Sequence, residues 1–135
     1  ELVKQIKSNG SVSYTLTGTK WWSTGAMDPR CRIAIVVAKM QDTTHSTTSN
    51  DDNNKHGKHT IVLVPLPNSN VSMVRPLTVF GYDDAPFGHA EVALQSVTLG
   101  PEHLIGGEGS GFKVSQARLG PGRIHHCMRA VGLGE

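Results

Sequence analysis

The chain has 135 residues, a formal net charge of +2 with its seven histidines neutral, and a sequence pI near 8.7. This length fits one domain with a modest core, and so small and scattered a positive excess does not indicate a nucleic-acid partner. No apolar run approaches the roughly 18 residues of a membrane span, and Cys31 and Cys127 lack metal-ligand spacing, so reduced thiols of an intracellular protein are expected.

Short strands separated by turn residues are predicted for most of the chain before residue 100. Asn9-Gly10 is a strong hairpin signal, and apolar and polar residues alternate directly after it. The run 32–39 is apolar throughout its middle and is expected to be a buried strand. Strands are predicted over residues 2–6, 12–17, 20–24, 32–39, 60–65, 71–75, 77–82 and 89–97. About seven short strands favour a small antiparallel, Greek-key-like β-barrel.

Two segments depart from the strand pattern. Residues 41–59 contain no apolar side chain, so they cannot offset the entropy of being ordered and are predicted to form a long mobile loop. After the glycine-rich stretch 106–111, apolar residues recur at helical spacing from Phe112, with an interruption at Gly120-Pro121-Gly122. A broken helix is therefore predicted at the C-terminal end.

The expected fold class is thus mainly β, with a C-terminal helical segment. We expect residues 1–106 to form the barrel domain and residues 107–135 to form a linker and the truncated start of a helical domain. The sequence begins at Glu1 without an initiator methionine and ends where an apolar helical pattern has only begun. A piece of a larger protein is therefore expected.

The segment from Gly18 to Thr24 is the most informative for function. Successive side chains of a strand point to opposite faces, so Trp22 and Thr24 are predicted to share one face while Trp21 and Ser23 share the other. An indole beside a hydroxyl suits a planar heteroaromatic ligand, because the indole covers the ring while the hydroxyl bonds a ring heteroatom. A tryptophan and a threonine in a strand are more often ordinary core, so both interpretations stay open on the residues alone.

Other polar clusters are weaker candidates. His45, His56 and His59 lie in the polar stretch without carboxylate or thiolate geometry, so solvated histidines are expected and no metal site is predicted. The adjacent residues His125-His126-Cys127 face apart on a helix. The glycines of 106–111 lack the Lys-Ser/Thr of a phosphate-binding loop and are interpreted as a flexible connection.

Several segments in fixed order resemble the middle domain of the acyl-CoA dehydrogenase family. Residues 14–26, Tyr-Thr-Leu-Thr-Gly-Thr-Lys-Trp-Trp-Ser-Thr-Gly-Ala, resemble the family's Gly-x-Lys and Trp-[Ile/Ser]-[Ser/Thr] steps, which contact FAD. Phe80-Gly81 stands where the family has a Leu-Gly-x-Arg turn, a departure shared by family members ten and eleven. Further resemblances lie in residues 88–92, 100–106, 109–112 and 119–127.

The resemblance implies an FAD-dependent acyl-CoA dehydrogenase of fatty acid β-oxidation, which removes the α proton and a β hydride from an acyl-CoA to give a trans-2-enoyl-CoA. It implies that Trp22, Ser23 and Thr24 bind the cofactor, with Trp22 against the flavin ring and the Thr24 hydroxyl near the hydride-accepting nitrogen. It matches Leu119 and Arg123 to positions on the substrate side. For Arg123, a solvated cation at a helix start is an equally good interpretation.

The base that takes the α proton is expected outside this chain. In most of the family it comes from a later helical domain, and in a minority it precedes the arginine matched by Arg123, where this chain has Gly122. No catalytic residue is therefore predicted, and the chain alone is expected to be inactive.

The resemblance also implies the partners and the setting of the enzyme. Acyl-CoA is the expected substrate, an electron-transfer flavoprotein the expected acceptor, and the intact enzyme is expected to be a homo-oligomer in mitochondria or peroxisomes. An acyl-CoA oxidase-like domain and a non-enzymatic β-barrel interaction module remain alternatives. The solvent exposure of Trp22 and Thr24 distinguishes the interaction module from the flavin enzymes. A cofactor wall leaves these two residues partly uncovered, whereas a core tryptophan is fully buried.

Overall fold

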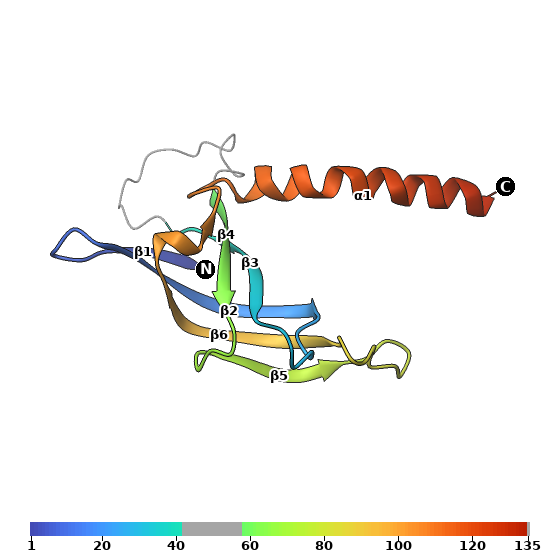
Figure 1. Cartoon of the computed structure of the whole chain (residues 1–135), viewed down its shortest axis with the longest axis horizontal. Helices are drawn as coiled ribbons and strands as arrows, with labels where there is room; N and C mark the ends of the chain where they lie inside the picture. Colours follow the sequence, from blue (N-terminus) through green and yellow to red (C-terminus); the bar gives the residue numbers. More distant parts are fainter. Residues whose placement is uncertain (42–57, 135) are drawn as a thin grey trace.

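The computed structural model describes residues 1–41 and 58–134, and within them the chain is mainly β with one long C-terminal helix (Figure 1). This confirms the predicted fold class. The elements are β1 (Leu2–Ile6), β2 (Val12–Thr24), β3 (Ile33–Lys39), β4 (His59–Pro65), β5 (Val71–Leu77), β6 (His89–Leu99), the short 3-10 helix η2 (Pro101–His103), β7 (Leu104–Ile105) and α1 (Gly111–Gly134). Most of the predicted loop 41–59 lies outside the described residues.

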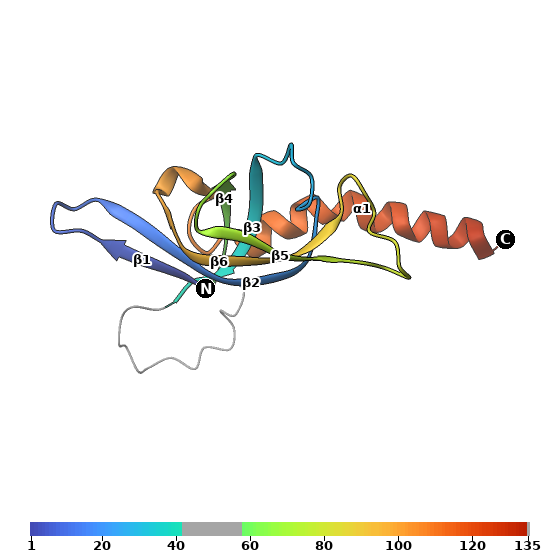
Figure 2. The same ribbon diagram turned by 90° about the horizontal axis from the view of Figure 1, so that it is seen from below.

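The strands pair antiparallel in two sheets, in the orders β1-β2-β6-β5 and β3-β4-β7. A single parallel bridge between Leu2 and Met40 joins β1 to the residue that follows β3. Figure 2 shows β3 and β4 crossing the strands of the four-stranded sheet. In the described part of the chain the two sheets pack face to face and do not close into the expected barrel.

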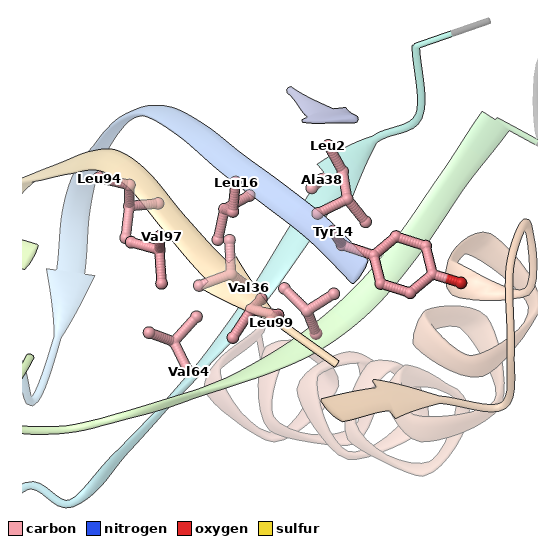
Figure 3. Packing of buried hydrophobic residues seen from close by; sticks show 10 residues of the cluster. Leu2, Tyr14, Leu16, Val36, Ala38, Val64, Leu94, Val97 and Leu99 are labelled. Atoms are coloured by element: carbon pink, nitrogen blue, oxygen red, sulfur yellow. The ribbon is translucent and has the colours of Figure 1, made fainter. Parts of the chain in front are cut away.

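The core lies between the two sheets, next to β1 and the first half of β2 (Figure 3). Leu2 and Leu16 come from the four-stranded sheet, Val62 and Val64 come from β4, and none of these four side chains is more than 1% exposed. Burying each such side chain contributes on the order of 1.5–3 kcal/mol. This end of the molecule therefore holds the two sheets together.

A polar contact at the edge of this core fixes the loop that precedes α1. The Tyr14 hydroxyl donates to Oε1 of Glu108 at 2.5 Å, and Nζ of Lys4 lies 2.9 Å from the same oxygen. Burial, the bond to Glu108 and the charge of that carboxylate raise the pKa of Tyr14 to about 12. The bonds from Tyr14 and Lys4 lower the pKa of Glu108.

The helix α1 begins against β4 at a residue that has no room for a side chain. A Cβ on Gly111 would lie 2.7 Å from the carbonyl carbon and oxygen of His59 and 2.8 Å from the amide nitrogen of Thr60. Beyond this contact α1 is exposed along almost its whole length and extends away from the sheets (Figure 1). None of the described helices is long and apolar enough to cross a membrane.

Three predicted boundaries are wrong. Residues 12–17 and 20–24 form one strand, β2, because Gly18 continues the ladder to β6 across a register shift. Residues 78–82 are a tight turn, closed by paired backbone hydrogen bonds between Val79 and Tyr82, with positive φ at Phe80 and Gly81. The helix α1 runs through Pro121 without a break, because a proline removes one intrahelical bond while the turns on either side keep theirs.

Candidate functional site

The C-terminal half of β2 contains a β-bulge at the tryptophan pair. Lys20 pairs with Val92 and Ser23 pairs with Ala90, so β2 advances three residues where β6 advances two. The extra residue is accommodated by Trp22, whose φ is 59°, in the left-handed region that side chains other than glycine rarely adopt. The bulge therefore interrupts the alternation of faces at the segment that the sequence singled out.

The bulge corrects the predicted orientation of the two indoles. The rings of Trp21 and Trp22 stack with centroids 6.2 Å apart and planes at 29°, so they do not point to opposite faces of the strand. Strict alternation holds only for a regular ladder, and one inserted residue changes the direction of the side chains next to it. The two tryptophans instead form one flat aromatic surface.

This surface is open in the described structure. Trp21 is 64% exposed and Trp22 is 44% exposed. Thr24 is also exposed, and Ser23 is half-buried. Exposed aromatic side chains of this size leave a large apolar area in contact with water, which is unfavourable unless another group covers it. The observation favours a binding wall over the core interpretation of the tryptophan pair.

A cavity of about 500 Å³ opens beside the bulge, between the end of β2 and the exposed side of β3. Trp21, Ser23 and Thr24 line it from β2, Ile35 lines it from β3 and Met73 lines it from β5. The lining is thus mostly apolar, with two hydroxyl groups at one side. At its rim the Lys20 ammonium donates to the carbonyl oxygen of Val37 at 2.7 Å, which links β2 to β3.

The turn that follows Thr24 is packed against loop 78–88. The amide of Gly25 donates to the carbonyl of Gly88 at 2.8 Å, and the Arg30 guanidinium lies 5.9 Å from the centre of the Phe87 ring. Hydrogen bonds from Arg30 to Asp28 lower the pKa of that carboxyl to about 2. These contacts hold the far end of β2 in place although little of it is buried.

A histidine that the sequence had only placed in a strand lies at the centre of this end. Nδ1 of His89 is 3.1 Å from the Thr24 hydroxyl, and its Nε2 is 3.4 Å from Oδ2 of Asp84. The imidazole also meets the Trp22 ring edge-on, with centroids 5.9 Å apart. No local pattern points to His89, because its contacts depend on the pairing of β2 with β6 across 65 residues of sequence.

The two residues matched to the substrate side lie on α1. Arg123 is exposed and donates to Oε1 of Gln116 in the same helix at 2.6 Å, and Leu119 is 39% exposed. Among the described residues, those that line the cavity come from β2, β3, β5, β6 and the segments that connect strands, and none comes from α1. The structure therefore places Ser23 and Thr24 at the cavity, with Trp22 next to them on β2 but not among the residues that line it. Leu119 and Arg123 lie on a separate element, α1.

Of the three histidines in the polar stretch, which were expected to be solvated, only His59 lies among the described residues. His45 and His56 lie outside the described residues, and the Nδ1 atom of His59 is buried without a hydrogen-bond partner. Within residues 1–41 and 58–134, no three histidine, cysteine or acidic side chains gather as metal ligands would.

The sequence of the chain matches the model of a known protein family over most of its length. The model described as "Acyl-CoA dehydrogenase, middle domain" matches residues 3–97, which include most of β1, all of β2 to β5 with the tryptophan pair, and most of β6. The chain belongs to the acyl-CoA dehydrogenase family. The middle-domain match thus covers both the strands and the candidate site.

Individual relatives agree with this assignment. The chain is 49% identical over 124 residues to human acyl-CoA dehydrogenase family member 11, covering 91% of the chain and 15% of the relative. It is 48% identical over 123 residues to "Probable acyl-CoA dehydrogenase IBR3" of Arabidopsis thaliana, covering 91% of the chain and 14% of the relative. A solved structure from Mycobacterium abscessus, assigned to an acyl-CoA dehydrogenase, superposes with a TM-score of 0.76 at 33% identity, over 98% of the chain and 30% of that structure. The chain therefore spans about one seventh of the length of these two curated relatives.

Proposed function

We propose that this chain forms one wall of the FAD and acyl-CoA site of a flavin-dependent acyl-CoA dehydrogenase. The reaction of that enzyme is the α,β-dehydrogenation of an acyl-CoA to a trans-2-enoyl-CoA, in fatty acid β-oxidation. The observation that carries the proposal is the open aromatic surface of Trp21 and Trp22 beside a cavity lined by the hydroxyls of Ser23 and Thr24. Family membership gives this geometry its chemical meaning.

The described residues fit the cofactor. A flavin ring is flat and largely apolar, with heteroatoms at its edge, so it matches a stacked indole surface next to two hydroxyl groups. When bound, FAD supplies the acceptor for the substrate hydride. In the proposed site Trp22 covers the ring and excludes water, Ser23 binds its edge, and Thr24 donates a hydrogen bond toward the accepting nitrogen.

The remaining functions belong to other parts of the enzyme. We assign the substrate side to Leu119 and Arg123 on α1, and we expect the base for the α proton outside this chain, since Gly122 has no side chain with which to act. The proposed division is a β-rich middle domain over residues 1–106 and the start of a helical domain over residues 107–135. We expect no acyl-CoA dehydrogenation by the chain alone.

The wider setting follows the family. We propose an electron-transfer flavoprotein as the electron acceptor, a homo-oligomeric assembly, and a mitochondrial or peroxisomal location. An acyl-CoA oxidase would use the same cofactor wall and pass its electrons to oxygen. A non-enzymatic interaction module is disfavoured by the exposure of Trp22 and Thr24, because a purely structural tryptophan pair would be buried in the core.

The full-length protein tests this proposal. We expect it to purify with FAD, and we expect anaerobic addition of acyl-CoAs of several chain lengths to bleach the flavin absorbance. Reoxidation by an electron-transfer flavoprotein but not by oxygen identifies a dehydrogenase, and fast reoxidation by oxygen identifies an oxidase. A protein that binds no FAD, or whose FAD no acyl-CoA bleaches, would rule out the proposed function.

A further inference from the structure

Three polar groups lie in a row from the cavity to loop 78–88. Thr24 is one of the residues that line the cavity, and its hydroxyl lies 3.1 Å from Nδ1 of His89. An oxygen of the Asp84 carboxylate lies 3.4 Å from Nε2 of the same ring. The edge-on contact with Trp22 holds the ring from the side. Each ring nitrogen of His89 thus has a polar neighbour. Neither His89 nor Asp84 has a role in the flavin wall proposed above.

The partners of His89 determine where its hydrogens lie. The ionised carboxylate of Asp84 can only accept a hydrogen bond, so its place 3.4 Å from Nε2 favours the tautomer that carries a hydrogen on this nitrogen. In the neutral ring Nδ1 then has only a lone pair, and the Thr24 hydroxyl must donate to it. In the charged ring Nδ1 donates to Thr24, so the single hydrogen of the hydroxyl is free to point into the cavity.

We propose that His89, oriented by Asp84, is a positioning residue that sets the direction of the Thr24 hydrogen bond. Thr24 then donates into the cavity only when His89 is protonated. The inference rests on the proposed function in one respect, which is that the group in the cavity is the hydride-accepting nitrogen of a flavin. The Asp84 side chain is 65% exposed, so its pair with His89 contributes little to stability and acts by placing a hydrogen.

Few charged side chains lie on the elements that surround His89. The charged side chains of the neighbouring described elements are Lys20 on β2, Asp83 and Asp84 on loop 78–88, Glu91 on β6, Arg75 on β5, and Asp28, Arg30 and Arg32 on the segment between β2 and β3. Arg75 pairs with Glu91 at 2.7 Å and Arg30 pairs with Asp28 at 2.8 Å, so these charges balance.

The first test needs no cofactor. Nitrogen-15 NMR of the histidine side chains of this chain, with His89→Phe to assign the signal, reports which ring nitrogen carries the hydrogen. We expect the Nε2–H form of His89 at high pH and a partial loss of this preference in Asp84→Asn. A neutral His89 with its hydrogen on Nδ1 would overturn the proposal, because Thr24 would then be an outward donor at every pH.

The second test uses the full-length enzyme with bound FAD. The rate of flavin reduction by acyl-CoA is measured against pH for wild type and for His89→Phe, which keeps a ring against Trp22 but removes both nitrogens. The ratio of the two rates cancels the titration of the base. As pH rises we expect the ratio of wild type to variant to fall on the order of tenfold, because wild-type Thr24 loses its outward donor when His89 loses its proton, while the variant keeps it.

The Thr24→Val background shows whether the effect passes through the hydroxyl. There His89→Phe is expected to leave the pH dependence of the rate unchanged, and His103→Asn, which removes a histidine–carboxylate pair elsewhere, is the matched control. A ratio independent of pH in the Thr24 enzyme, or an equal pH effect without the hydroxyl, would overturn the inference. An enzyme that lacks FAD or is never bleached by acyl-CoA contradicts the proposed function instead, whereas the NMR test of the relay stands independently.

Discussion

The two halves of β2 differ although the same neighbour, β6, pairs with both. In the first half Tyr14 and Leu16 are buried between the sheets and face the side chains of β3 and β4. In the second half Trp21, Trp22 and Thr24 are exposed, and the bulge turns the indoles into one stacked surface. Backbone pairing also differs, because β1 pairs with the first half alone. The three-stranded sheet likewise covers the first half and leaves the second half open.

This contrast assigns stability and binding to different ends of one strand. Buried apolar area stabilises the fold at the first half, whereas an exposed aromatic pair contributes little until something covers it. Substitutions in the first half should therefore unfold the protein, and substitutions in the second half should change ligand binding or flavin chemistry with the fold intact. Each of the following changes tests that separation.

The largest loss of stability is expected for Leu16→Ala. Leu16 is 1% exposed in the centre of the core, so truncation removes apolar contacts and leaves a cavity, at a cost of about 2–5 kcal/mol in the free energy of unfolding. Denaturant titration followed by circular dichroism measures it. Thr19→Ala, an exposed change on the same strand, is the control and should cost far less. Equal losses for both would mean that the first half of β2 is not the stabilising end.

A smaller loss is expected for Tyr14→Phe, which removes the hydroxyl bonded to Glu108 and costs about 1–3 kcal/mol.

The bond between Tyr14 and Glu108 also predicts that the stability of the protein depends on pH. The folded pKa of Tyr14, about 12, lies above its ordinary value of 10.0, so its contribution is complete below pH 10 and is lost as pH rises toward 12. Wild type should therefore lose stability across this interval more steeply than Tyr14→Phe. Parallel curves in a denaturation series would argue against the contact.

The smallest loss of stability is expected for Trp22→Ala, below about 1 kcal/mol, because the side chain is largely exposed and away from the core. Retention of FAD by the full-length protein should nevertheless weaken, since the substitution removes apolar cover from the proposed flavin ring. Ile6→Ala, an exposed apolar residue at the other end of the sheet, is the matched control. Unchanged retention during dialysis, or a loss as large as that of Leu16→Ala, would break the comparison between the two halves.

Local patterns predicted much of the fold. The weakly strand-like residues before the Asn9-Gly10 turn predicted β1 with its observed bounds, and the β-branched run before Pro65 predicted β4 to within one residue. The described strands form two sheets that are not closed into a barrel, and strand patterns alone do not determine whether two sheets join at their edges. The turn at Phe80-Gly81 was read as strand, since its apolar residues look like a strand and only the glycine indicates positive φ.

The candidate site was predictable in its residues and not in its geometry. The adjacent tryptophans and the hydroxyls after them are visible in the sequence, and they do lie together beside a cavity. The bulge that stacks the indoles depends on the register between β2 and β6. No residue near Trp22 in the sequence predicts that register. His89 could not be found for the same reason, since its position beside Thr24 exists only after the two strands pair.

The most direct measurement of the central claim is the rate of flavin reduction in Thr24→Val, made in the full-length enzyme by stopped-flow absorbance with acyl-CoA. It is made at the acidic end of the pH series, where the proposed arrangement leaves the Thr24 hydroxyl free to donate into the cavity. Valine keeps the shape of the side chain and removes the hydroxyl, so with Thr19→Val as the control the fold should be unchanged. Loss of one oriented donor predicts a rate lower by on the order of ten- to a thousandfold. Reduction at the wild-type rate would contradict the assignment of the open half of β2 to the flavin.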